Sequence, residues 1–139
     1  MLKEHDVIAF VATVQPDRAR RFYCDVLGLN LVEDSPFALV FDVGGRMLRI
    51  QKGQTFVPAP HTVLGWSVRD IRREIESLMT RGVTFERYPG MSQDELGVWT
   101  SPDGHKVAWF RDPDGNNLSL TEFRPRQRAS TGSGCASGH

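Results

Sequence analysis

Two charged side chains are the strongest candidates for chemistry in this chain, and each lies in a segment typical of a β-strand. Glu122 ends the segment "DPDGNNLSLTEF", where it shares a strand face with Leu118 and Leu120, and Arg49 lies in "RMLRIQK". Burying a lone carboxylate is costly, whereas an arginine guanidinium can donate to both of its oxygens. If both side chains face one cavity, Arg49 and Glu122 would therefore form a pair. In the alternative, both side chains reach solvent at the rim of a sheet.

The elements that must position these residues follow from the hydrophobic periodicity. The strand-type run "DVIAFVATV" precedes "QPDRARRFYCDVLG", whose apolar residues recur at helical spacing up to a stop at Gly28. Three further strand-type runs follow: "LNLVE", "FALVFDV" and "RMLRIQK". After the connection "GQTFVPAPH" comes a second strand, "HTVLGWSV", and a second helix, "RDIRREIESLMTRG", which stops at Gly82. The runs "VTFERY", "GVWTS", "HKVAWFR" and "NNLSLTEF" predict the remaining strands.

The two halves of the chain repeat one pattern, because the spacing from Val14 to Val68 equals that from Gly28 to Gly82. We predict an α+β fold in a single domain, 1–124, built from two βαβββ modules at 7–58 and 61–124. Each helix would cover one face of its sheet, and the opposite faces would form a hollow. The small and polar residues of 125–139 predict a flexible tail.

The composition excludes several functional classes. The chain has 17 basic and 17 acidic residues, so bulk charge predicts no binding to nucleic acid or to a membrane surface. No apolar run approaches the roughly 20 residues that a membrane-spanning helix requires. The two cysteines, Cys24 and Cys135, form no disulfide framework, which favours reduced thiols and a cytoplasmic location.

The order βαβββ, present twice, resembles that of the vicinal oxygen chelate superfamily, and so do three segments: "FYCDVLGL", "LGWSVRDI" and "FRDPDGNNLSLTEF". This superfamily includes glyoxalase I, bleomycin-resistance proteins, extradiol dioxygenases and fosfomycin-resistance enzymes. The resemblance covers about residues 7 to 123. It implies two curved sheets around a cleft, with one helix outside each sheet and, in many members, a divalent metal such as zinc, nickel, iron or manganese in the hollow.

Carried over residue by residue, the resemblance places Glu122 at one ligand position and Ile8, Val63 and Arg49 at the other three. It therefore implies that Arg49 and Glu122 face the same cavity. Neither Ile8 nor Val63 has a donor atom, and a guanidinium cannot bind a cation. We therefore expect no tightly bound metal and no other cofactor. The alternative is a displaced metal site made of Asp6, Gln51, His61 and Glu122.

Aromatic and polar residues are expected to line the rest of the hollow. Phe10 shares a strand face with Ile8, and Gln51 shares the face of Arg49. Trp99 lies in a long connection, where it can form a wall or a lid of the hollow or, alternatively, pack under the loop. One of Trp109 and Phe110 must face the cleft, and the sequence leaves open which. The predicted ligand-binding residues are Arg49, Phe10, Gln51, Trp99 and Trp109.

Two functions remain. The first is a homodimeric binding protein that holds a small organic molecule in an apolar hollow, without metal, as the resemblance to bleomycin-resistance proteins implies. The second is an enzyme of the same superfamily, a lyase, isomerase or dioxygenase, with Glu122 as metal ligand or general base. We expect a dimer because short strands in two sheets leave edges and a hollow that one small chain covers poorly.

Overall fold

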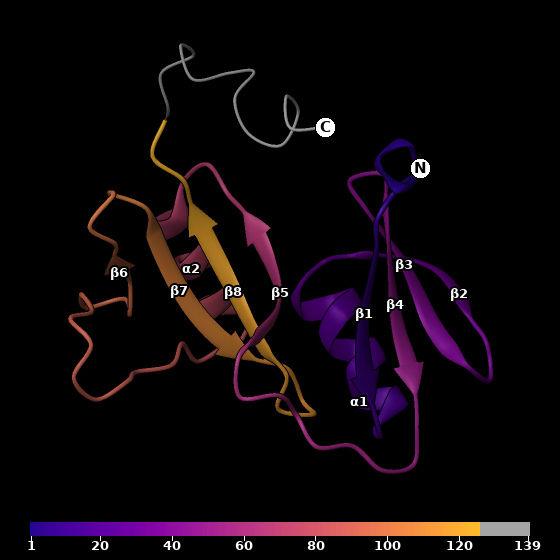
Figure 1. The fold of residues 1–139 in the computed structure, drawn as a ribbon. Helices are drawn as coiled ribbons and strands as arrows, with labels where there is room; N and C mark the ends of the chain where they lie inside the picture. Colours follow the sequence, from indigo (N-terminus) through magenta and orange to yellow (C-terminus); the bar gives the residue numbers. More distant parts are fainter. Residues whose placement is uncertain (126–139) are drawn as a thin grey trace.

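The structure, a computed structural model, describes residues 1–125 and contains two four-stranded sheets (Figure 1). The first sheet has the strand order β1-β4-β3-β2, and the second has the order β5-β8-β7-β6. The strands of the first sheet are β1 (Ile8–Thr13), β2 (Asn30–Asp34), β3 (Ala38–Val43) and β4 (Arg46–Lys52). Those of the second are β5 (Thr62–Ser67), β6 (Trp99–Thr100), β7 (Lys106–Arg111) and β8 (Asn117–Glu122).

One helical segment follows the first strand of each sheet. Helix α1 (Pro16–Arg21) continues into a π-helical segment, η2 (Phe22–Val26), and helix α2 (Ile71–Thr80) follows β5; a single 3-10 turn, η1 (Leu2–Glu4), precedes β1. In both sheets the first strand pairs in parallel with the last strand, and the other pairs are antiparallel. The predicted fold of two βαβββ modules is therefore confirmed. No helix within residues 1–125 is long and apolar enough to cross a membrane.

The sequence prediction of a strand at "VTFERY" is wrong, because residues 83–88 form no ladder. Their single backbone bond to the sheet runs from Glu86 N to Trp109 O, at 2.7 Å. The side chain of Gln93 accepts from Tyr88 N and donates to Glu86 O, so it occupies backbone groups that a strand partner would need. The predicted tail lies outside the described residues, apart from Pro125.

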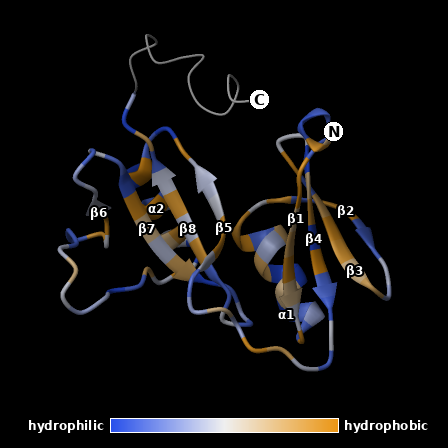
Figure 2. Ribbon diagram, in the orientation of Figure 1, coloured by the Kyte–Doolittle hydropathy of each residue, from blue (hydrophilic) through white to orange (hydrophobic). Residues whose placement is uncertain are grey.

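The helix-facing sides of the two sheets share one hydrophobic core. Phe110 of β7 is fully buried at its centre and packs against the rings of Phe22, Trp66 and Phe85, with centroid distances of 6.5, 6.3 and 5.3 Å. Figure 2 shows the hydrophobic residues concentrated along the strands, including β1 and β3. Because Phe22 belongs to the first module and Phe110 to the second, the modules are joined through the core itself.

A buried polar clasp also joins the modules. The Tyr23 hydroxyl donates to Asp112 Oδ2 at 2.7 Å, and Asn116 Nδ2 donates to the Ala12 carbonyl at 2.9 Å. Burial, and then the neighbouring Asp112 carboxylate, raise the pKa of the Tyr23 hydroxyl well above its ordinary value, so it remains a protonated donor. The segments "FYCDVLG" and "DPDGNN" therefore meet in the structure, one from each module.

Candidate functional site

The side of the first sheet that faces away from the helices is open and largely apolar. We call it the first open face, and its residues are Ile8, Phe10, Met47, Arg49 and Gln51. Ile8, Phe10 and Met47 are 44%, 50% and 41% exposed, whereas the alternate residues Val11, Leu48 and Ile50 are buried in the core. Phe10 and Gln51 line a depression of about 270 Å³ with Phe56 and Val63. These predicted residues therefore do share one surface.

The second sheet has an open face of a different character, which we call the aromatic face: Tyr88, Trp99, Trp109, Arg111 and His61. The ring of Trp109 lies 5.6 Å from that of Tyr88 and 6.3 Å from that of Trp99, measured between centroids. His61, Tyr88, Trp109 and Arg111 line a depression of about 400 Å³. Trp109, and not the buried Phe110, is thus the residue of β7 on the open side.

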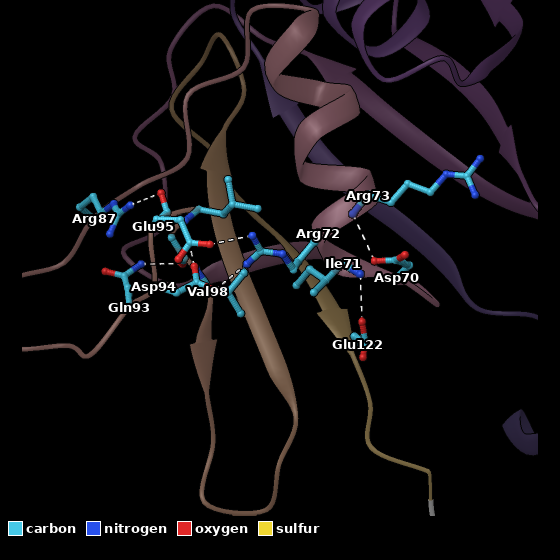
Figure 3. Close-up of polar contacts among 12 residues, drawn as sticks. Asp70, Ile71, Arg72, Arg73, Arg87, Gln93, Asp94, Glu95, Val98 and Glu122 are labelled. Carbon is cyan, nitrogen blue, oxygen red and sulfur yellow. Dashed lines mark hydrogen bonds and ion pairs between the residues drawn. The ribbon is translucent and has the colours of Figure 1, made fainter.

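Glu122 does not face the hollow, contrary to the sequence prediction. It lies on the helix-facing side of β8, in the same row as the buried Leu118 and Leu120, and its Oε1 accepts from Ile71 N at 3.0 Å (Figure 3). Asp70 Oδ1 accepts from Arg73 N at 3.2 Å in the same turn. The two carboxylates satisfy backbone donors that are left free at the start of α2 and complement its dipole.

The predicted pair of Arg49 and Glu122 is therefore wrong, because Arg49 lies on the open side of the first sheet and Glu122 lies on the helix-facing side of the second. The nearest polar contact recorded for Arg49 is its Nη1 with Met47 Sδ, at 4.0 Å. Within residues 1–125, Arg49 has no ion pair. Its charge is therefore available to a ligand on the first open face.

The residues at the strand centres of the open faces do not fit a divalent metal. The positions at the strand centres are Phe10 in β1, Arg49 in β4, Gly65 in β5 and Ser119 in β8. None of them supplies an imidazole or a carboxylate. The displaced site that combines Asp6, Gln51, His61 and Glu122 is not formed, since the part of the chain that the structure describes holds no cluster of three His, Cys, Asp or Glu.

Sequence reasoning missed Ser119 and Gly65, which lie side by side on the open face of the second sheet. The two residues are register partners, and a Cβ on Gly65 would lie 2.6 Å from Ser119 Oγ. Ser119 has Trp109 as its partner on the other side. Ser119 lies between Leu118 and Leu120 in the strand, so its side chain points to the opposite face. Assigning the two leucines to the helix-facing side would therefore have identified Ser119 as a residue of the open face.

The loop that carries Tyr88 is held against α2 by ion pairs (Figure 3). Arg72 contacts Asp94 at 3.3 Å and Glu95 at 2.6 Å, and its hydrogen bond lowers the pKa of the exposed Glu95 carboxyl. Asp94 Oδ1 also accepts from Leu96 N and Val98 N, each at 2.9 Å. These contacts fix the position of the loop that borders the aromatic face.

Replacing Glu122 by alanine should lower the free energy of unfolding by about 1 kcal/mol, because the first N–H of α2 loses its acceptor. Glu122→Gln should cost less, since an amide oxygen still accepts. Urea denaturation measures both. Glu76→Ala, an exposed change on the same helix, is the control; a loss at Glu122 no larger than at Glu76 would contradict the capping role.

Comparison with known proteins agrees with this architecture. The family model described as Glyoxalase/Bleomycin resistance protein/Dioxygenase superfamily matches residues 6–120. A member of that superfamily from Sphaerobacter thermophilus is 25% identical, with a TM-score of 0.67 over 86% of this chain and 97% of that chain. Lactoylglutathione lyase from Agrobacterium tumefaciens is 21% identical, with a TM-score of 0.62 over 85% and 92%. TioX from Micromonospora sp. ML1 is 20% identical, with a TM-score of 0.63 over 85% and 98%. A search of curated proteins found no match.

Proposed function

The chain belongs to the Glyoxalase/Bleomycin resistance protein/Dioxygenase superfamily, and from this premise we propose that it binds a planar aromatic anion on its open faces without a metal. The observation that carries the proposal is the aromatic face, where the rings of Tyr88, Trp109 and Trp99 follow one another at centroid distances of 5.6 and 6.3 Å, in T-shaped and tilted arrangements. Such a row favours flat ligands, because aromatic pairs gain energy beyond the area that they bury. An acid–base or metal-dependent reaction has no comparable support, since Glu122 lies on the other side of β8.

The preference for an anion follows from the charges on the open faces. Arg49 is partly buried among apolar neighbours, and no acidic side chain in the described residues pairs with it. Arg111 Nε lies 3.5 Å from Glu86 Oε1, and this ion pair partly compensates the charge of Arg111. A guanidinium binds a carboxylate in a planar geometry with two parallel hydrogen bonds. Arg49 therefore serves as the orienting group in an otherwise apolar site.

We also propose a homodimer, in which a second copy covers the first open face. Ile8, Phe10 and Met47 form an exposed apolar row on regular strands, a feature more typical of an interface than of a free surface. Each copy presents both an apolar face with Arg49 and an aromatic face. Two copies that pair in this way would enclose a ligand that one chain alone leaves open to solvent.

The ligand proposal predicts that 1-naphthoate binds more tightly than its neutral analogue 1-naphthalenemethanol in isothermal titration calorimetry. Trp109→Ala should weaken naphthoate binding roughly tenfold, through lost stacking. Arg49→Gln should remove the preference for the anion, whereas Arg46→Gln, at the exposed start of the same strand, should preserve it. Absence of naphthoate binding, or binding that both Trp109→Ala and Arg49→Gln leave unchanged, would contradict the proposal.

The dimer proposal predicts a molecular mass of two chains in sedimentation analysis at micromolar concentration. Met47→Glu places a charge on the apolar row and should shift the protein to a monomer. Val32→Glu is the matched control, because Val32 is 62% exposed on the edge strand β2 and lies outside the proposed interface. A wild-type monomer, or equal effects of the two substitutions, would speak against this interface.

A further inference from the structure

A further cavity lies on the side of the sheets away from the open faces, where the two modules meet. Its volume is about 230 Å³. Leu27 and Leu29 of the first module form one wall, and Trp66 and Leu78 of the second module form the other. Phe110 and Leu120 also line it from the helix-facing side of β7 and β8, so it is separated from the aromatic face by the second sheet.

Two contacts join the modules beside this cavity. Phe22 packs on Phe110, and Arg81 Nη1 donates to the Val26 carbonyl at 3.1 Å, which bridges the modules at the far end of α2. Within the cavity lining, Leu27, Trp66 and Leu78 are only partly buried. Partly exposed apolar walls are a favourable surface for a small apolar molecule.

The rim of the cavity carries a carboxylate without a partner. Glu74, on the first turn of α2, lines the cavity, and its side chain has no hydrogen bond or ion pair within residues 1–125. No arginine of the described residues lines this cavity, and Arg81 lines the neighbouring one. An apolar space with one negative group at its edge is complementary to an apolar molecule that carries a positive charge.

We propose that this inter-module cavity binds a small arylalkyl- or alkylammonium ion, with its hydrocarbon part between Leu27 and Leu78 and its charge beside Glu74. The size suits one ring with a short chain, because a protein cavity of roughly 150 Å³ holds a benzene molecule. The site is distinct from the open faces in position and in charge preference. A bound molecule would contact both modules and would therefore stabilise their association.

The test is a titration of the full chain with 2-phenylethylammonium, followed by the indole N–H resonances of the three tryptophans in nitrogen–proton NMR spectra. We expect the Trp66 resonance to shift, because Trp66 lines this cavity, whereas Trp99 and Trp109 lie on the aromatic face. The ammonium should bind about threefold to tenfold more tightly than the neutral 2-phenylethanol. Glu74→Gln should abolish that difference, and Glu76→Gln, on the exposed side of the same helix, should keep it.

A substitution that fills the cavity gives an independent check. Leu78→Phe should prevent both compounds from shifting Trp66, and Leu29→Phe does the same from the opposite wall if Leu78→Phe impairs folding. The proposal is overturned if Trp66 does not respond, if amine and alcohol bind equally in the wild type, or if only Trp99 and Trp109 respond. Because naphthoate binding is measured separately, failure here leaves the aromatic-face proposal standing.

Discussion

Asp112→Ala is expected to lower the free energy of unfolding by about 3–5 kcal/mol, because it leaves several buried donors without an acceptor. Asp112 Oδ2 accepts from the Tyr23 hydroxyl at 2.7 Å and from Asn116 Nδ2 at 2.8 Å. Its Oδ1 accepts from the backbone N–H groups of Asp114 and Asn116, each at 2.9 Å. Urea denaturation followed by circular dichroism measures the loss.

The second Pro-Asp-Gly turn supplies the matched control. Ser101 occupies the position in "SPDG" that Asp112 occupies in "DPDG", and its Oγ accepts from His105 N at 3.0 Å. Ser101→Ala removes one hydrogen bond at the periphery and should cost at most about 1 kcal/mol. Tyr23→Phe should cost about 1–2 kcal/mol alone and much less in the Asp112→Ala background, because the two residues share one bond. Additive losses would refute the clasp.

Phe110→Ala is expected to cost about 3–5 kcal/mol, as for other large-to-small changes at a buried aromatic position. The ring touches aromatic residues of both modules, so a cavity there would weaken the contact between Phe22 and the second sheet. Thermal and urea unfolding measure the effect. Phe110→Leu, which keeps most of the volume, should recover a large part of the loss.

The neighbouring residue on the same strand should behave in the opposite way. Trp109 is partly exposed on the aromatic face, so Trp109→Ala should cost less than about 1.5 kcal/mol of stability. It should nevertheless weaken naphthoate binding, which Phe110→Leu should preserve. If Trp109→Ala destabilises the fold more than Phe110→Ala, the assignment of the two faces of β7 is wrong.

Local patterns in the sequence predicted most of the fold. The helical spacing of apolar residues, the glycine stops and the repeat predicted both helices and the order of the strands, since each depends on residues close in the chain. Residues 83–88 were predicted wrongly for a tertiary reason. Their composition suits a strand, but the side chain of Gln93, after the turn at Pro89, bonds to the backbone at Tyr88 and Glu86.

The site was predicted less completely than the fold. Phe10, Arg49 and Gln51 lie on the open face of the first sheet, and Trp99 and Trp109 lie on that of the second. The sequence had left open which of Trp109 and Phe110 faces the cleft. The prediction for Glu122 was wrong because a row of apolar residues ending in a carboxylate was assigned to the hollow. In the structure that row packs on α2, and the carboxylate meets a helix N-terminus formed by residues far away in the chain.

The sequence by itself determined which residues share a strand face, where the chain turns, and which chemical groups are available. Leu118, Leu120 and Glu122 must lie on one side of β8, because side chains alternate along any strand. Only the tertiary structure decided which side this is, since the two faces of an isolated strand are equivalent until a helix packs against one of them. That choice buried Phe110, exposed Trp109, and turned Glu122 from a candidate ligand into a helix cap.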